Sequence, residues 1–328
     1  MQVPIEKIMV AVISLLEQRG LNGGDAQVVC DHLVTAETRG YPSHGLSRLP
    51  AILRTLEGCQ GQCESTLQKV TSSTAQYEAN GKLGIIAVTE AVGILNHMVK
   101  STGLSMIAVT GYVGTTGSIG QYVQIAAEQN IIMLATSSSE YAVAPYGSRR
   151  AILGTNPMAI GFPLQPDAVV ADVATAAWSY GDLRLAMTQG RQIPAGVVQT
   201  IDGEASTDPN DADNGSQLPM AGHKGYALGL AMELLCGPFA GGKAGRDAVN
   251  GTDATLLIGF RADLFRDNAE VSADAMALAA EIHAAPLAQT FDEVLLPGEG
   301  AARRRRQNLR NGYLEVNDEI LGLTRIEP

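Results

Sequence analysis

The stretch "SMIAVTGYVGTTGSIGQYVQIAAEQNIIMLATS", residues 105–137, predicts the fold class. It opens with the apolar run "SMIAVT" and closes with "IIMLATS", and both have the length and composition of buried strands. The segment "GQYVQIAAEQN" between them has the pattern of a helix. A strand, a helix and a second strand in succession predict an α/β region with a buried sheet.

The segment between the first strand and the helix, "GYVGTTGSIG", has glycines at positions 111, 114, 117 and 120. Dinucleotide-binding loops occur at such a place, but this spacing does not fit G-x-G-x-x-G. No acidic residue ends a second strand about twenty positions further on. The motif therefore predicts a turn whose backbone lies close to a ligand or a helix, without a Rossmann fingerprint.

On the amino-terminal side the chain is predicted to be helical. One amphipathic helix ends near Gly20, a second runs from about residue 25 to 39, and a third follows Pro50 and stops at Gly58. Residues 90–101 predict a further helix before the first strand. The chain has neither a signal-peptide pattern nor an apolar run long enough for a bilayer, so we expect a soluble, cytoplasmic protein without a membrane partner.

On the carboxyl-terminal side the pattern is less regular. Residues 144–166 contain too many glycines and prolines for a long helix, and "VVADVATA" at 169–176 predicts a short buried strand. Residues 181–219 are polar and turn-rich, which indicates a long surface excursion. The segment 224–237 is apolar on nearly every face and predicts a helix buried in the core. Residues 298–316 predict a basic helix and a turn.

Composition bounds the class of protein. The 328 residues are 45% hydrophobic and 17% charged, which is typical of a globular enzyme rather than a disordered chain. The net charge of −11 argues against nucleic acid and acidic membranes as partners, so an anionic substrate needs a locally positive pocket. The cysteines have no histidine spaced to complete a zinc set, and we expect free thiols and no metal site at Cys30, Cys59, Cys63 and Cys236.

The segment "GYPSHGLSRLP", residues 40–50, is a candidate catalytic motif. If Ser43 caps a short helical turn, His44 and Arg48 project from one face, because residues four apart are neighbours on a helix. A histidine gives and takes a proton near neutral pH, and an arginine binds a carboxylate through two parallel hydrogen bonds. Together they could hold a 2-oxo acid and protonate its carbonyl. On the pattern alone, a capped helix with an exposed basic face is the better interpretation.

Two more motifs combine polar groups with turns. In "LGTNPMAIGFP", Thr155 lies where the following proline forces an extended turn, so its hydroxyl could bind backbone or ligand. Asp172 ends an apolar strand, from which it could orient a histidine or, more commonly, cap a helix. Either motif read alone favours an ordinary structural role.

Two basic segments could meet a phosphate. His223 and Lys224 stand at the predicted start of the apolar helix, where free N–H groups and the helix dipole attract anions. The arginines at 303–306 follow a "PGEG" turn and could contact a cofactor phosphate. Solvated helix faces are the alternative for both.

The blocks "SHGLSR", "LGTNPMAIGFP", "DVAT", "GHKGYALGLAMELL" and "LPGEGAARRRR" in this order resemble the type-2 malate/L-lactate dehydrogenase family. The resemblance runs from about residue 5 to 325. It implies an α/β protein with a non-Rossmann fold, and a homodimer with the active site near the interface. It also implies an amino-terminal helical lobe (1–70), a substrate-side α/β region (71–123) completed by 286–328, and a cofactor-binding domain with a mixed sheet (124–285).

The same resemblance implies roles for residues at matching positions. His44 would be the proton donor and acceptor, Arg48 the carboxylate ligand, and Ser43, Thr115 and Thr155 would contact the substrate. The residues that would contact a nicotinamide cofactor are Asp172, Ala174, Thr175, Ala176, Trp178, Ser179, Tyr180, His223, Lys224, Gly225, Glu299 and Arg304.

The chain departs from the family pattern at two positions. Thr115 falls where most members have a second active-site histidine, and a hydroxyl cannot take up a proton at neutral pH. Asp182 replaces the usual Lys or Glu near the cofactor. A carboxylate there would repel a 2′-phosphate and slightly favours NADH over NADPH, whereas the arginines at 303–306 favour NADPH.

These expectations together predict an NAD(P)H-dependent oxidoreductase that interconverts a small 2-oxo acid and its 2-hydroxy acid. One alternative is reduction of a cyclic imine-2-carboxylate such as pyrroline- or piperideine-2-carboxylate, since an imine is protonated without a second histidine. Another is a family member that only binds a nucleotide or an acid.

Overall fold

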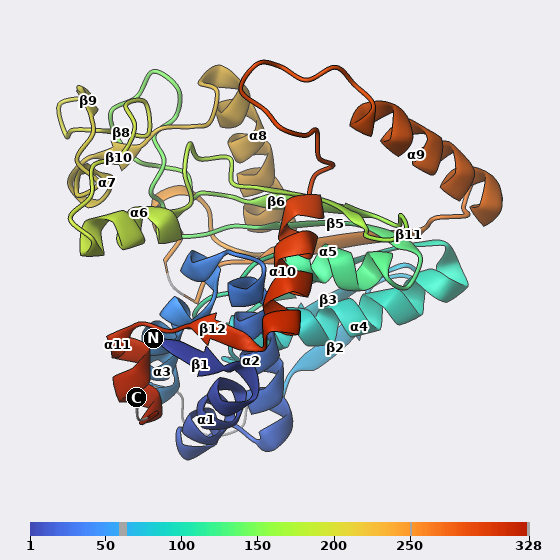
Figure 1. The fold of residues 1–328 in the computed structure, drawn as a ribbon, viewed down its shortest axis with the longest axis horizontal. Coiled ribbons are helices and arrows are strands. Elements are labelled where there is room, and N and C mark those ends of the chain that lie inside the picture. The colour runs from blue at the N-terminus through green and yellow to red at the C-terminus, as the bar shows by residue number, and fades with distance from the viewer. Residues whose placement is uncertain (59–63, 250, 327–328) are drawn as a thin grey trace.

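The computed structural model describes residues 1–58, 64–249 and 251–326 (Figure 1). Its helices are α1 (Ile5–Gln18), α2 (Gly23–Thr38), α3 (Leu49–Glu57), α4 (Gly84–Thr102), α5 (Gly120–Ala127), α6 (Tyr180–Thr188), α7 (Asp211–Asn214), α8 (His223–Leu234), α9 (Asn268–His283), α10 (Glu299–Asn311) and α11 (Asp318–Thr324). Shorter helical turns are η1 (Pro42–His44), η2 (Leu46–Arg48), η3 (Leu235–Phe239) and η4 (Gly245–Asp247).

The strands form three sheets. They are β1 (Gln2–Pro4), β2 (Thr66–Lys69), β3 (Thr74–Glu78), β4 (Leu104–Thr110), β5 (Ile131–Ser137), β6 (Met158–Phe162), β7 (Val169–Val173), β8 (Val198–Gln199), β9 (Ala205–Ser206), β10 (Ser216–Gln217), β11 (Thr255–Arg261) and β12 (Tyr313–Glu315). The main sheet has the order β2-β3-β4-β11-β5-β6-β7, and only β3 and β4 pair in parallel. A mixed sheet of this order is not a Rossmann sheet, which confirms the predicted fold class.

The segment that predicted the fold forms the centre of this sheet. The predicted second strand corresponds to β5, the first to β4, and the glycine-rich turn leads into α5. Helices α4 and α5 pack on one face of the sheet, where Val88, Leu95 and Ile107 belong to one buried cluster. The opposite face packs against the η3 region through Cys236 and Leu256.

The amino- and carboxyl-terminal ends of the chain form one lobe. Helices α1, α2 and α3 enclose a core with α11, and β1 pairs with β12 so that Val3 lies opposite Leu314 (Figure 1). The three predicted amino-terminal helices are therefore confirmed. The three-part domain division stays a prediction. Strands from both sides of its boundary at residue 123, β4 on one side and β5 and β11 on the other, belong to one sheet.

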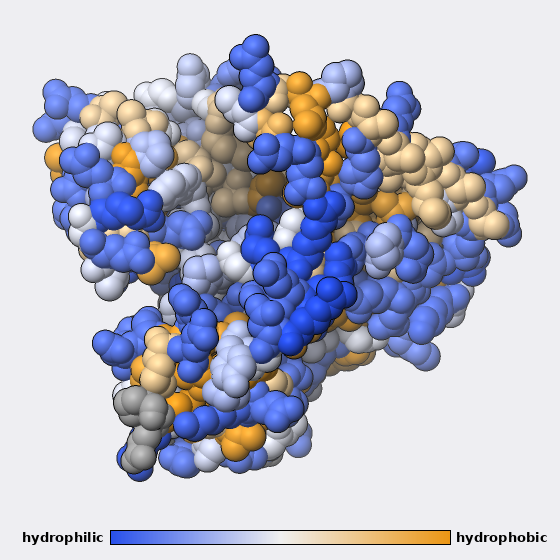
Figure 2. Space-filling view, in the orientation of Figure 1, coloured by the Kyte–Doolittle hydropathy of each residue, from blue (hydrophilic) through white to orange (hydrophobic). Residues whose placement is uncertain are grey.

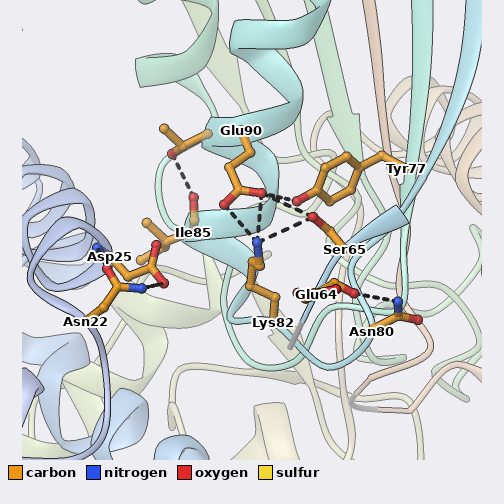
Figure 3. A network of polar contacts seen from close by, with 10 residues as sticks. Asn22, Asp25, Glu64, Ser65, Tyr77, Asn80, Lys82, Ile85 and Glu90 are labelled. Atoms are coloured by element: carbon orange, nitrogen blue, oxygen red, sulfur yellow. Dashed lines mark hydrogen bonds and ion pairs between the residues drawn. The ribbon is translucent and has the colours of Figure 1, made fainter. Parts of the chain in front are cut away.

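A polar network ties β3 and α4 to the turn before α4 (Figure 3). The ammonium of Lys82 donates to both carboxylate oxygens of Glu90, at 2.8 and 2.9 Å, and to the hydroxyl of Ser65 at 3.4 Å. The hydroxyl of Tyr77 donates to the same carboxylate. We call these four residues the Lys82 cluster; each charged group in it has a charged or hydroxyl partner.

Three predictions about the later chain are wrong. Strand β7 is an exposed edge strand and not a buried one, because the sheet ends there. Residues 181–219 are not a simple surface excursion: they fold into α6, α7 and the small sheet β10-β8-β9 around a core containing Leu183 and Val198. Helix α8 is not enclosed, since Leu228, Leu230 and Leu234 are exposed on this single chain.

Helix α9 is exposed to an unusual degree. None of its residues is buried, although Met276 and Leu278 are apolar. Figure 2 shows apolar side chains gathered along this helix. Among the described residues, no helix is long and apolar enough to cross a membrane.

Candidate active site

The SHG-x-x-R motif forms two consecutive helical turns, η1 and η2, ahead of α3. The buried carboxylate of Glu37 accepts a hydrogen bond from the backbone N–H of Leu46 at 2.9 Å, which fixes the start of the second turn. A Cβ at Gly45 would lie 2.2 Å from Oε2 of Glu37, so a larger residue would displace this carboxylate and its hydrogen bond to Leu46. The Glu37 contact thus holds the backbone between His44 and Arg48.

Ser43 does not cap a helix, which corrects the expected local geometry. Neither η1 nor η2 has a side-chain cap, and the hydroxyl of Ser43 lies 3.1 Å from Nδ1 of His44. This contact leaves Nε2 of His44 as the nitrogen that faces away from the serine. Ser43 therefore orients the imidazole rather than the helix.

Arg48 is held by its Nε, which donates to the carbonyl of Ser43 at 2.7 Å. Within the described residues, its two terminal nitrogens have no hydrogen-bond or ion-pair partner. Gly181 permits this close approach, because a Cβ there would lie 2.7 Å from Nη2 of Arg48. The fork that binds carboxylates is therefore positioned and unused.

The two side chains line a cavity of about 620 Å³ between the amino-terminal lobe, one end of the sheet and the α6–β10 region. Figure 2 shows the surface hollowed between the α6 region and the amino-terminal lobe. The sequence-predicted residues that meet in the cavity are His44, Arg48, Thr115, Thr155 and Tyr180.

The electrostatics of the cavity favour a neutral imidazole. Burial, and then the charge of Arg48, lower the pKa of His44 to about 4, with Asp182 acting in the opposite direction. Burial also lowers the pKa of Arg48, while Asp182 and Tyr180 raise it. The imidazole of His44 is thus neutral at neutral pH, next to the guanidinium of Arg48.

Asp182 lies near His44 and Arg48. It accepts a hydrogen bond from the hydroxyl of Ser179 at 2.8 Å, and its carboxylate lies within electrostatic reach of His44 and Arg48. The expectation that Asp182 repels a 2′-phosphate and slightly favours NADH stays a prediction. The place of Asp182 beside His44 and Arg48 could not be predicted from the sequence, because it depends on α6 folding back onto η1.

Thr115 and Thr155 present hydroxyls to the cavity from two turns. The hydroxyl of Thr115 accepts a hydrogen bond from the N–H of Gly117 at 2.9 Å. Thr155 is held by its own N–H, which donates to the hydroxyl of Ser139 at 3.0 Å. The neighbouring Asn156 is structural, since its amide donates to Glu233 at 2.6 Å.

The cavity also contains an acidic residue that the sequence did not single out. Asp253 lies just before β11, and its Oδ1 is buried without a hydrogen-bond partner. Burial and the nearby charges of Glu140 and Glu233 raise the pKa of Asp253 to about 7. Nothing local marks it, because pairing of β11 between β4 and β5 brings it to the cavity.

The predicted cofactor residues between 172 and 179 cap helices, form hydrogen bonds to the backbone or pack in apolar clusters. Asp172 caps α5 by accepting from the N–H of Gly120 at 3.0 Å, the commoner of its two expected roles. Thr175 is buried and donates to the carbonyl of Thr155, while Ser179 caps α6. Ala174, Ala176 and Trp178 lie in or against small apolar clusters.

The remaining predicted cofactor residues lie outside this cavity lining. His223, Lys224 and Gly225 begin α8, which confirms the predicted start of this helix, and its first turn has no side-chain cap. Glu299 begins α10 and pairs with His283 at 2.8 Å. Arg304 donates to the backbone carbonyl of Arg39 at 2.9 Å.

The described residues contain no group of histidine, cysteine and carboxylate side chains arranged to hold a metal ion. Cys30 and Cys236 are buried free thiols. Cys59 and Cys63 lie outside the described residues.

Known proteins are similar to this chain over most of its length. Residues 3–323 match the family model described as malate/L-lactate dehydrogenase. A malate/(S)-sulfolactate dehydrogenase of Methanothermus fervidus is 31% identical over 91% of this chain and 88% of its own. A Δ1-pyrroline-2-carboxylate/Δ1-piperideine-2-carboxylate reductase of Pseudomonas putida is 29% identical over 74% of this chain and 72% of its own.

A crystal structure of a dehydrogenase from Sinorhizobium meliloti superimposes with a TM-score of 0.91 and 30% identity, covering 99% of this chain and 98% of that one. The fold, the family match and these relatives agree with the resemblance seen in the motifs. This chain therefore belongs to the malate/L-lactate dehydrogenase family and is an oxidoreductase of that family.

Proposed function

We propose that this enzyme interconverts a small 2-oxo acid and its 2-hydroxy acid with NAD(H) or NADP(H). The observation that carries the proposal is the placement of an unpaired guanidinium fork and a neutral imidazole in one cavity, at Arg48 and His44. A carboxylate bound to Arg48 would bring the neighbouring C2 oxygen toward His44. The fork fixes both position and orientation of the acid, as a near-attack geometry requires.

His44 would move the proton bound to the substrate oxygen. In oxidation the neutral imidazole accepts the hydroxyl proton at Nε2, while Ser43 holds Nδ1. In reduction the same nitrogen returns the proton to the carbonyl oxygen. A substrate carboxylate on Arg48 offsets the charge that depresses the pKa of His44, so substrate binding helps the imidazole to carry this proton.

The nicotinamide cofactor would supply or accept the hydride. The cavity fits a nicotinamide ring beside a small acid, because Thr115, Thr155 and Tyr180 offer hydroxyls around a space of about 620 Å³. The uncapped first turn of α8, with Lys224, suits the cofactor phosphates. The other proposed contacts are those inferred from the resemblance, at 172–180, 299 and 304.

A panel of acids tests this function. Purified protein with NADH or NADPH is mixed with pyruvate, oxaloacetate, sulfopyruvate, 2,3-diketogulonate or pyrroline-2-carboxylate, and the cofactor absorbance is followed. Oxidation of the cofactor by one of the 2-oxo acids supports the proposal. Tight cofactor binding without turnover of any acid would contradict it and favour a protein that only binds.

Reduction of a cyclic imine-2-carboxylate is the second candidate, and Asp253 is the observation that favours it. A protonated imine carries a positive charge, and Asp253 with Glu140 gives the cavity wall carboxylates that have no cationic partner among the described residues. Turnover of pyrroline-2-carboxylate at least tenfold faster than of every 2-oxo acid in the panel would select this candidate.

We also propose that the enzyme acts in the cytoplasm as a homodimer. Exposed apolar side chains on α8 and η3, such as Leu234 (52% exposed) and Phe239 (64% exposed), form a surface suited to burial against a second copy. Light scattering on the purified enzyme should give twice the mass of one chain, and Leu234→Glu should lower it. A monomer at micromolar concentration contradicts this assembly.

A further inference from the structure

A second cavity, of about 300 Å³ and partly open to solvent, lies between α2, α5 and α10. It shares no lining residue with the cavity that contains His44 and Arg48. Arg39 at the end of α2 and Arg305 on α10 both line it. The catalytic proposal uses neither side chain.

Neither arginine side chain in this cavity has a hydrogen-bond partner in the part of the chain that the structure describes. Arg39 is only 7% exposed, and the Nε atoms of Arg39 and Arg305 are buried without a hydrogen bond. Within residues 1–58, 64–249 and 251–326, neither guanidinium forms an ion pair. Burial and the charge of Arg305 lower the pKa of Arg39, which means that the two cations repel each other across the cavity.

Two unpaired guanidinium groups this close are costly unless an anion lies between them. Buried charges in folded proteins are normally paired, because an unpaired ion loses its hydration without compensation. Guanidinium groups prefer planar or tetrahedral oxyanions, which they bind through parallel hydrogen bonds. The cavity volume accommodates a phosphate group together with a small organic substituent.

His32 provides a neutral donor at the same cavity. Its Nε2 accepts a hydrogen bond from the N–H of Ser118 at 2.9 Å, so the neutral ring carries its proton on Nδ1. Burial, and then the charges of His44 and Arg39, lower the pKa of His32 to about 3, which keeps the ring neutral at physiological pH. A neutral N–H donor next to two cations completes a set suited to an oxyanion.

Two carboxylates also border the cavity, and both have other hydrogen-bond donors. Asp31 accepts from the amide of Gln27 at 2.7 Å, and Glu128 accepts from the amide of Gln124 at 2.9 Å. Glu128 attracts Arg39 at longer range, as does Asp172 from outside the cavity lining, and neither forms an ion pair with it. The carboxylates therefore reduce the positive potential without satisfying the guanidinium N–H groups.

We propose that this cavity is a binding site for a phosphate group, held by Arg39 and Arg305 with His32 as a neutral donor. The group could be free inorganic phosphate, or the phosphate of a nucleotide such as the 2′-phosphate of NADP. Both sources offer the same tetrahedral oxyanion, and the experiment distinguishes them.

Calorimetric titration of the intact protein with inorganic phosphate, with chloride adjusted to hold the ionic strength constant, tests the site. We expect binding that Arg305→Gln weakens about tenfold or more, since it removes one charged fork. Arg310→Gln removes the same charge from an exposed position on the same helix and should leave the Kd unchanged. Glu128→Gln should tighten binding, because it removes the opposing carboxylate.

Titrations with NADP⁺ and NAD⁺ identify the source of the phosphate. If Arg305→Gln weakens the binding of NADP⁺ but not of NAD⁺, the cavity receives the 2′-phosphate of the cofactor. If it weakens the binding of inorganic phosphate and leaves the affinities for both cofactors unchanged, the phosphate site is separate from the cofactor site. The proposal is overturned if, for each of phosphate, NADP⁺ and NAD⁺ taken separately, the wild type, Arg305→Gln and Glu128→Gln bind the ligand with the same affinity. Folding of each variant is checked by its thermal unfolding, so a loss of structure is not mistaken for a loss of the site.

Discussion

Two polar clusters border the amino-terminal lobe, and they differ in how fully their hydrogen-bonding groups are used. In the Lys82 cluster (Figure 3) a lysine, a tyrosine and a serine surround one carboxylate, that of Glu90. In the cavity that contains Arg48 and His44, the arginine side chain hydrogen-bonds only through Nε, and the imidazole only with Ser43, among the residues that the structure describes. In the first cluster the lysine and the carboxylate bind each other. In the second, the terminal nitrogens of the guanidinium have no partner among the described residues and are available to a ligand.

The difference teaches where to look for function in this fold. A saturated cluster rigidifies the protein, because each member loses a partner when another is removed. A cluster with unused donors costs stability and persists where a ligand completes it. The two clusters should therefore respond to mutation in opposite ways: stability should change in one and catalysis in the other.

The largest expected effect is at His44. His44→Ala should lower kcat roughly a hundredfold or more, because a general acid/base contributes that much to a proton transfer. Cofactor affinity and thermal stability should change little. Steady-state kinetics with fluorescence titration of the cofactor check this, and wild-type turnover in the variant would refute the role of the imidazole.

Arg48→Lys should raise the KM for the acid roughly tenfold to a hundredfold, since a point charge cannot replace the two parallel bonds of the fork. Its kcat should fall less than that of His44→Ala. Saturation curves in the substrate decide the matter. An unchanged KM would show that the carboxylate binds elsewhere.

The Lys82 cluster should show the reverse behaviour. Lys82 is 16% exposed, and Lys82→Met leaves the Glu90 carboxylate without its cation, so the free energy of unfolding should fall by about 2 kcal/mol while kcat/KM stays unchanged. Arg19→Met is the matched control, because it breaks the more exposed Arg19–Glu57 pair and should cost less than about 1 kcal/mol. Chemical denaturation measures the free energy of unfolding of both variants. A fall in kcat/KM of Lys82→Met without a loss of stability would show that the Lys82 cluster contributes to catalysis.

The smallest expected effect is a shift of the acidic limb of the pH–rate profile to lower pH. The pKa of His44 is lowered to about 4, so the imidazole remains a proton acceptor well below the pH at which an ordinary histidine becomes protonated. In the hydroxy-acid oxidation direction, kcat/KM should stay level down to about pH 5 and fall as pH drops through the lowered pKa. Loss of activity already below about pH 6.5 would indicate an unperturbed histidine.

Local sequence was sufficient for the elements whose own residues determine them. The apolar run at β5 and the glycine-rich turn before α5 are visible because strand length and positive φ values at Gly111, Gly114 and Gly117 depend on nearby residues. The pairing of His44 with Arg48 was also accessible, since both lie in one short segment. Their local conformation was not, because Glu37 and Gly45 determine it through a buried contact.

What the sequence could not provide depends on contacts between distant segments. Asp253 reaches the cavity only because β11 inserts between β4 and β5. Asp182 approaches His44 and Arg48 only when α6 packs on η1. The exposed face of α8 was mistaken for core, because hydropathy reports that leucines are apolar and not what covers them.

A crystal structure of the enzyme with NADH and oxamate, a 2-oxo acid analogue, tests the central claim most directly. We predict the oxamate carboxylate on the terminal nitrogens of Arg48 and its carbonyl oxygen about 3 Å from Nε2 of His44. Oxamate bound at another place, with neither Arg48 nor His44 in contact with it, would contradict the account.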